Sequence, residues 1–401
     1  MSSISLINLE TRSARIAASL DARPHVGAIW RRIVALSEAA ASLGLEDIGV
    51  KESDIARPAM HMGIVQGEPQ SVTIARGIHR ALLNPPSIAR DPGAAFDRIF
   101  TTSYMSQLLE GDSGPRVDYP VGYEVEDWVR ARDAFALAAP KLLNHPAPIT
   151  LRALAVAQLA AGLAPQRYPM AERLLFSASE SEMRKDLVLS DPIISRSIEG
   201  LDRKVDASWV MLPSISLSRG GYRAWSPATH SGRTTVVDRM HHTLGAEAGR
   251  IGQVALWHER MLTEFHGKTK SSRRSDFSAL VSQTPVINGS VVASALSVTE
   301  RSARRLIEDA TEMGLLKELT RRRVYQVWAV PALAEMIQER STNRLEALSP
   351  GRDVSVKAGD TVRKSASSYD TDGFDQRVAK IMDDLDEAMA NADRVLEKYK
   401  V

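Results

Sequence analysis

Apolar residues recur every three or four positions along most of residues 1–266, which is the spacing of an amphipathic α-helix. Glycine or proline separates one such stretch from the next. We therefore predict a helical N-terminal body, with its large aromatic residues in the core. The expected helices are Ala28–Leu43, Gln70–Leu83, Ala94–Leu109, Glu124–Leu143, Leu151–Leu163, Met170–Lys185 and Val236–Phe265.

The stretch Trp209–Val237 interrupts this pattern, because proline and glycine are scattered among short apolar runs. We interpret it as a long loop or a small hairpin, and loops of this length in compact domains are often functional. Four of its residues form a candidate anion pocket: Arg219, Arg223, His230 and Arg233. The alternative is that these are ordinary surface side chains.

A different order of elements follows in Ser275–Val330. The pattern predicts three short helices, with a break at Pro285–Gly289 and a tight turn at Ser297–Thr299, and then two strands joined by a basic turn. The expected elements are helices Asp276–Val281, Ser290–Leu296 and Glu300–Met313 and strands Leu315–Leu319 and Val324–Val330. This is the order of a winged helix-turn-helix, in which the third helix enters a DNA major groove and the hairpin wing reaches the backbone.

The third helix has clear boundaries in the sequence. Thr299 is a good N-cap, and Gly314 stands where a left-handed residue ends a helix. Apolar residues at spacings of three and four predict one buried face and leave the polar residues of the first two turns on the other side. The candidate DNA-binding residues are Thr299, Arg301, Ser302, Arg304 and Arg305 on this helix, Arg321, Arg322 and Arg323 in the wing, and Arg273 and Arg274 before the first helix. The alternative is a solvated basic face.

The string Val291–Ile307, followed by Glu312–Leu316, resembles the winged helices of bacterial regulators, and most closely the small one appended to many Fic-family proteins. The whole chain, a helical body ending in this module, also resembles an uncharacterised family from rhizobial and related alphaproteobacterial replicons. The first resemblance implies a DNA-binding or protein-binding fold. The second implies no activity.

The Fic resemblance directs attention to the Fic motif, His-Pro-Phe-x-Asp/Glu-Gly-Asn-Gly-Arg. The stretch His242–Gln253 keeps the histidine, the second glycine and Arg250, but Ala246 replaces the acidic residue and Glu247-Ala248 replaces Gly-Asn. A phosphate-cradling nest of backbone N–H groups is poorly served by glutamate at a position that needs glycine's positive φ. We expect a coincidental match and no enzyme activity; the alternatives are a degenerate Fic-like domain and, last, an active nucleotidyl transferase.

The chain after the module changes in composition. Residues 341–373 are rich in Ser, Gly, Asp and Lys and predict a flexible linker. Residues 374–401 then repeat apolar positions from Val378 to Tyr399 at spacings of three and four, which predicts a terminal amphipathic or coiled-coil helix. The predicted organisation is a mainly α protein with a helical body at 1–266, a winged helix-turn-helix at 271–340, the linker and this helix.

Charge and cysteine content refine this interpretation. The chain has a net charge of +2 and no cysteine, which excludes disulfides and thiolate metal sites. Eleven Lys/Arg and six Asp/Glu lie between Lys268 and Arg323, so basic charge gathers in the predicted DNA-binding module. The N-terminal stretch Ser2–Asp21 has no apolar run long enough for a signal peptide or a membrane span. We expect a cytoplasmic, nucleoid-associated protein that needs neither a cofactor nor a metal and does not bind a membrane.

These observations favour a sequence-specific DNA-binding protein, a transcriptional regulator that acts as a homodimer on double-stranded DNA. Its body is expected to dimerise and to sense an unidentified small-molecule or protein effector. The alternatives are a plasmid or chromosome maintenance factor, which differs only in the use of the bound DNA, and a degenerate Fic-like enzyme with an accessory winged helix.

Overall fold

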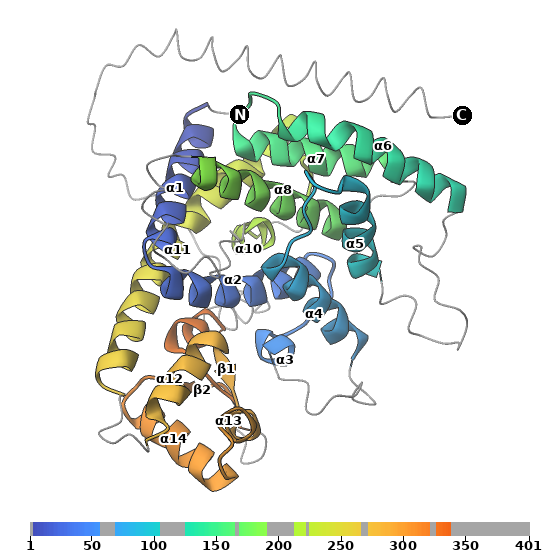
Figure 1. Cartoon of the computed structure of the whole chain (residues 1–401). Coiled ribbons are helices and arrows are strands. Elements are labelled where there is room, and N and C mark those ends of the chain that lie inside the picture. The colour runs from blue at the N-terminus through green and yellow to red at the C-terminus, as the bar shows by residue number, and fades with distance from the viewer. Residues whose placement is uncertain are drawn as a thin grey trace, which may run out of the picture.

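The computed structural model describes residues 3–56, 69–104, 125–164, 168–190, 212–221, 224–265, 272–320 and 326–337, and its fold is mainly α (Figure 1). The body contains α1 (Ser3–Asp21), α2 (Pro24–Gly44), α3 (Glu52–Ala56), α4 (Gln70–Leu83), α5 (Pro92–Tyr104), α6 (Val125–Leu143), α7 (Ile149–Leu163), α8 (Pro169–Ser190), α10 (Pro213–Arg219) and α11 (His230–Thr263). The C-terminal module contains α12 (Arg274–Gln283), β1 (Val286–Ile287), α13 (Gly289–Leu296), α14 (Glu300–Glu312), β2 (Lys317–Glu318) and β3 (Trp328–Ala329), and residues 331–337 are helical.

The long periodic stretches of the body form helices as predicted, and α4 has the predicted bounds of Gln70–Leu83. Helix α11 begins earlier than expected, at His230, because Thr229 caps it by accepting the N–H of Gly232 at 3.0 Å. The expected helix Ala94–Leu109 is described as far as Tyr104.

The prediction of a loop over Trp209–Val237 is wrong at both described ends. Residues Pro213–Arg219 form α10, with Pro213 to Leu217 buried, and the first turns of α11 occupy His230 onwards. Helix α10 has no N-cap side chain of its own. The buried carboxylate of Glu38 on α2 instead accepts the N–H groups of Ser214 at 2.8 Å and Ile215 at 3.0 Å. A helix of this length, capped from another part of the chain, leaves no periodic signal in its own sequence.

Helix α2 crosses the middle of the body in Figure 1 and packs against α4, α10 and α11. Its side chains Trp30, Ile33 and Val34 are fully buried. Helix α7 is covered by α6 and α8 and is buried on most of its surface. Two buried arginines of α8 are paired across the core. Arg173 pairs with Glu46 at 2.8 Å and Arg184 pairs with Glu10 at 2.9 Å, so both buried guanidinium groups have a carboxylate partner.

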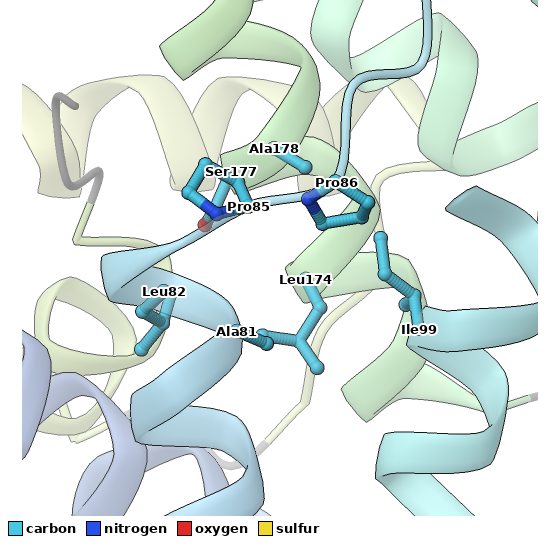
Figure 2. A pocket seen from close by; sticks show the side chains of 8 residues that line it. All are labelled: Ala81, Leu82, Pro85, Pro86, Ile99, Leu174, Ser177 and Ala178. Atoms are coloured by element: carbon cyan, nitrogen blue, oxygen red, sulfur yellow. The ribbon is translucent and has the colours of Figure 1, made fainter. Parts of the chain in front are cut away.

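A small apolar void lies between α4, α5 and α8 (Figure 2). Its lining residues are Ala81, Leu82, Pro85, Pro86, Ile99, Leu174, Ser177 and Ala178. Its volume of about 10 Å³ is at the lower limit for one water molecule. This void is a packing defect and not a ligand site.

The module is joined to the body by direct contacts, most of them buried. Trp257 of α11 donates its indole N–H to the carbonyl of Leu315 at 2.7 Å, and the ring of Phe265 lies 5.5 Å from the ring of Phe277 on α12. From α2, Arg32 donates to the carbonyl of Gln283. The apolar core is continuous from the body through these contacts into the module.

The module contains an antiparallel three-stranded sheet in the order β1-β3-β2. Ala329 of β3 is paired with Val286 on one side and with Lys317 on the other. The sequence predicts only a break at Pro285–Gly289 and does not indicate β1, whereas β2 and β3 lie inside the two predicted strands.

Residues 338–401 lie outside the described part of the chain, so the predicted linker and terminal helix remain predictions. In the described ranges, no helix combines the length and the apolar character that crossing a membrane requires.

Candidate nucleic-acid interface

Both ends of α14 are capped by specific hydrogen bonds. At the start, Thr299 accepts the N–H of Ser302 at 3.2 Å, as the sequence predicted. At the end, Gly314 has a φ of 69°, and the N–H groups of Leu315 and Gly314 return to the carbonyls of Ala310 at 2.8 Å and Thr311 at 2.9 Å. This is the Schellman arrangement, in which a left-handed glycine ends the helix.

The turn between α13 and α14 uses the same arrangement without a glycine. Ser297 has a φ of 53°, and the N–H of Val298 bonds to the carbonyl of Ala293 at 3.0 Å. Helix α13 begins at Asn288, whose side chain accepts the N–H of Val291 at 2.8 Å. The two helices are therefore joined by a short connection of defined geometry, which sets the direction of α14.

The faces of α14 are divided as the sequence predicted. Ala303, Ile307 and Ala310 are buried. The candidate contact residues Arg301, Ser302, Arg304 and Arg305 are all exposed. The first turns of α14 thus present three guanidinium groups and a hydroxyl to solvent, on a helix that is held from behind by the apolar core.

The exposed arginines differ in what they contact. Arg304 donates to Oε1 of Gln326 at 2.8 Å, and Gln326 donates to Glu318 at 3.2 Å, which links α14 to β2 and to the residues that precede β3. Arg304 also lies 3.8 Å from Glu308. In the described ranges no carboxylate pairs with Arg301 or Arg305. These two side chains are therefore available to a ligand.

The two arginines before the first helix are engaged within the module. Arg274 pairs with Asp309 of α14 at 2.6 Å, and its guanidinium lies 4.9 Å from the ring centre of Phe265. It joins α12, α14 and the end of α11, so these contacts hold Arg274 within the module, and its contact with DNA stays a prediction. Arg273 pairs with Asp276 at 3.0 Å, with both side chains about half exposed. Such a pair contributes little to stability and can open.

The sequence did not indicate Gln326, Glu318 or Asp309 as neighbours of the interface. Their partners are distant in sequence, and no helical spacing joins them. The wing residues Arg321, Arg322 and Arg323 lie outside the described residues.

The candidate anion pocket is not assembled from its described members. Arg219 pairs with the buried carboxylate of Glu247 at 3.3 Å. His230 and Arg233 lie on the first turn of α11, about 20–25 Å along the helix axis from Glu247 at the usual rise per residue. Arg219 is therefore placed near Glu247 and far along α11 from both of these residues, and Arg223 lies outside the described residues.

The Fic-like stretch His242–Gln253 lies entirely within α11. The backbone N–H groups of a helix interior already bond to the carbonyls four residues earlier, so this stretch forms no phosphate-cradling loop. Glu247 instead accepts the indole N–H of Trp30 at 3.2 Å and pairs with Arg250 and Arg219. The charged residues of this motif stabilise the packing of α2, α10 and α11.

No family model matches the chain, and no curated protein is significantly similar to it.

Proposed function

We propose that residues 272–337 form a winged helix-turn-helix and that the protein binds double-stranded DNA in a sequence-specific manner, as a transcriptional regulator. The observation that supports the proposal is α14: a capped helix, entered through a tight turn from α13, whose exposed face carries Arg301, Ser302, Arg304 and Arg305. The order α12-β1-α13-α14-β2-β3 agrees with this fold.

In the proposed complex, the first turns of α14 enter the major groove. A guanidinium can form two hydrogen bonds with O6 and N7 of a guanine, and each such contact distinguishes bases by about 1–3 kcal/mol. Arg301 and Arg305 are the best placed for base contacts because no described carboxylate pairs with them. Arg304, which donates to Gln326 just before β3, is better placed to hold Gln326 and to contact a phosphate.

A single module covers a short half-site, and specific regulators commonly double the site by two-fold symmetry. We therefore propose a homodimer. The contact between the module and the body would then fix the spacing of the two recognition helices, since Trp257, Phe265 and Arg32 join the two parts through buried or direct contacts.

The test is to map the genomic sites bound by the protein and to measure affinity for the best fragment by fluorescence anisotropy at fixed salt. The variant Arg304→Ala/Arg305→Ala should bind this fragment at least about tenfold more weakly, because one base contact and one positioning contact are lost. Arg90→Ala, an exposed arginine of the body, is the matched control and should bind like wild type. A folded double variant with wild-type affinity would contradict the proposal.

A further inference from the structure

A groove of about 570 Å³ lies between α1 and α11. This volume is typical of small-molecule sites, which span about 300–1,000 Å³. Its lining residues are Asn8, Thr11, Arg12, Arg15, Ile16 and Ser19 from α1 and His241, Ala248 and Ile251 from α11. This site could not be predicted from the sequence, because its two walls are more than two hundred residues apart in the chain.

The position of Arg12 depends on a glycine of α11, Gly245. The guanidinium of Arg12 donates to the carbonyl of His241 at 2.6 Å, and a Cβ on Gly245 would lie 2.8 Å from Nη1 of Arg12. Glycine at this position leaves room for the guanidinium to lie across the helix. Arg12 is therefore held at the groove before any ligand arrives, which reduces the entropy lost on binding.

The groove carries an excess of positive charge. Arg15 follows Arg12 on α1, is exposed, and has no carboxylate partner among the residues that the structure describes. Burial, followed by repulsion from Arg12 and His242, lowers the pKa of His241, which makes it a neutral hydrogen-bonding group at pH 7. The carboxylate of Asp238, on the same helix, opposes this shift by raising the pKa of His241. Because Arg12 and Arg15 outnumber the one carboxylate, Asp238, the groove favours a negatively charged ligand.

The remaining lining residues determine what kind of anion fits. Ile16 and Ile251 are buried, and the methyl group of Ala248 is exposed in the groove, so one part of the surface is apolar. The side chains of Asn8, Thr11 and Ser19 supply uncharged hydrogen-bonding groups. A site with few polar groups and an apolar wall suits an organic molecule with one charged end.

The groove is separate from the proposed DNA-binding face. His241 lies about 24 Å along α11 from Trp257, which contacts the module, at the usual rise of about 1.5 Å per residue. A ligand in the groove therefore does not touch α14. It does contact the helix whose other end supports the module.

We propose that the groove between α1 and α11 binds a small organic anion, with its carboxylate or phosphate held by Arg12 and Arg15 and its apolar part against Ile16, Ala248 and Ile251. This binding site stands whether or not the protein binds DNA, because none of its residues belongs to the module.

Isothermal titration of the full chain tests the site with three probes: phenyl phosphate, benzoate and inorganic phosphate. We expect saturable binding of phenyl phosphate or benzoate, and weaker binding of inorganic phosphate because it lacks an apolar part. Arg15→Gln should reduce the affinity about tenfold, the usual scale for one charge-assisted hydrogen bond. Arg90→Gln, on another exposed arginine, should change nothing.

A second pair of variants tests the apolar wall. Ala248→Leu should narrow the groove at its apolar wall and weaken binding. Ala246→Leu makes the same change at an exposed position of α11 that does not line the groove, and should leave binding intact. Absence of saturable binding to all three probes, or equal binding by the two leucine variants, would overturn the proposal. DNA affinity measured on the same variants separates failure of this site from failure of the DNA-binding proposal.

Discussion

At the scale of single residues, the neighbouring arginines Arg304 and Arg305 have different surroundings. Both are exposed, but Arg304 is bonded to Gln326, and no described carboxylate pairs with Arg305. A guanidinium that already has a partner exchanges one hydrogen bond for another when it binds DNA, so its net contribution is smaller. The two side chains should therefore contribute unequally to base recognition.

We expect Arg305→Ala to lower affinity for the preferred DNA site about 5- to 150-fold, the equivalent of one base contact, and to relax sequence preference at one position. Gln326→Ala should have a smaller effect, spread evenly over sequences, because it loosens Arg304 without removing a base contact. Anisotropy titrations against a panel of single-base variants of the site would distinguish the two. If Arg305→Ala lowers affinity equally for all variants of the site, Arg305 contacts a phosphate and not a base.

The turn residue Ser297 gives a second test at this scale. Its φ of 53° is a left-handed conformation that costs an ordinary residue about 1–2 kcal/mol and glycine almost nothing. Ser297→Gly should raise the free energy of unfolding by roughly 0.5–1 kcal/mol, since the lost strain exceeds the extra entropy of the unfolded chain.

Ser294→Gly is the matched control for this prediction. Ser294 is exposed and lies within α13, where glycine has a lower helix propensity than serine and lowers stability by up to about 0.5 kcal/mol. Urea unfolding of both variants should therefore give shifts of opposite sign. If both variants shift the free energy of unfolding in the same direction, the left-handed conformation of Ser297 does not destabilise the protein.

Residue-level features could be predicted wherever the partner was local. Thr299 and Gly314 were assigned correctly because a cap lies within a few residues of the groups it satisfies. The contacts of Arg274 with Asp309 and Phe265 could not be predicted, because these partners come from other elements and nothing in the local sequence indicates them.

At the scale of elements, prediction succeeded for long helices with one apolar face and failed for short or remotely stabilised ones. Helix α10 depends on Glu38 of α2, and β1 exists because β3 pairs with it. Helix α1 is different, because its buried residues Leu6, Leu9, Ile16 and Leu20 keep the helical spacing. Helix α1 therefore has a periodic signal in the sequence, although it is not among the predicted helices.

The packing of α4 against α2 predicts a response to acid. Nε2 of His79 is buried and has no hydrogen-bond partner in the described part of the chain. Burial, followed by repulsion from Arg32 and Arg80, lowers the pKa of His79 to about 4. The unfolded chain therefore takes up a proton more readily than the folded one, so the neutral histidine stabilises the fold fully above about pH 6.5 and progressively less as the pH falls toward 4.

Between pH 7 and pH 5 we expect the wild-type protein to lose about 2 kcal/mol more of its free energy of unfolding than His79→Leu, in which no proton can bind. Chemical denaturation at the two pH values measures this difference. His242→Leu, on an exposed histidine of α11, is the control and should keep the wild-type response. If His79→Leu is as acid-sensitive as wild type, the loss arises from other groups.

At the scale of the whole molecule, α11 connects the two regions for which functions are proposed. Its 34 residues span about 50 Å, with the groove against α1 along one part and Trp257 against the module near its end. If the groove binds a ligand, a change there would reach the module through this one helix and would move α14 as a unit. None of this could be predicted from periodicity, which defines α11 as a helix but does not indicate its neighbours.

The last prediction concerns assembly. The body offers a large helical surface, whereas the predicted seam from Val378 to Tyr399 is about three heptads long and has alanine at two core positions, which makes a weak coiled coil. The predicted linker 341–373 is also too long and too polar to fix the spacing of two recognition helices. We therefore expect a chain truncated after Arg340 to remain a dimer and to lose only a modest part of its DNA affinity. Light scattering of the truncated chain at micromolar concentration measures this directly, and a monomer mass would assign the dimer contact to the tail.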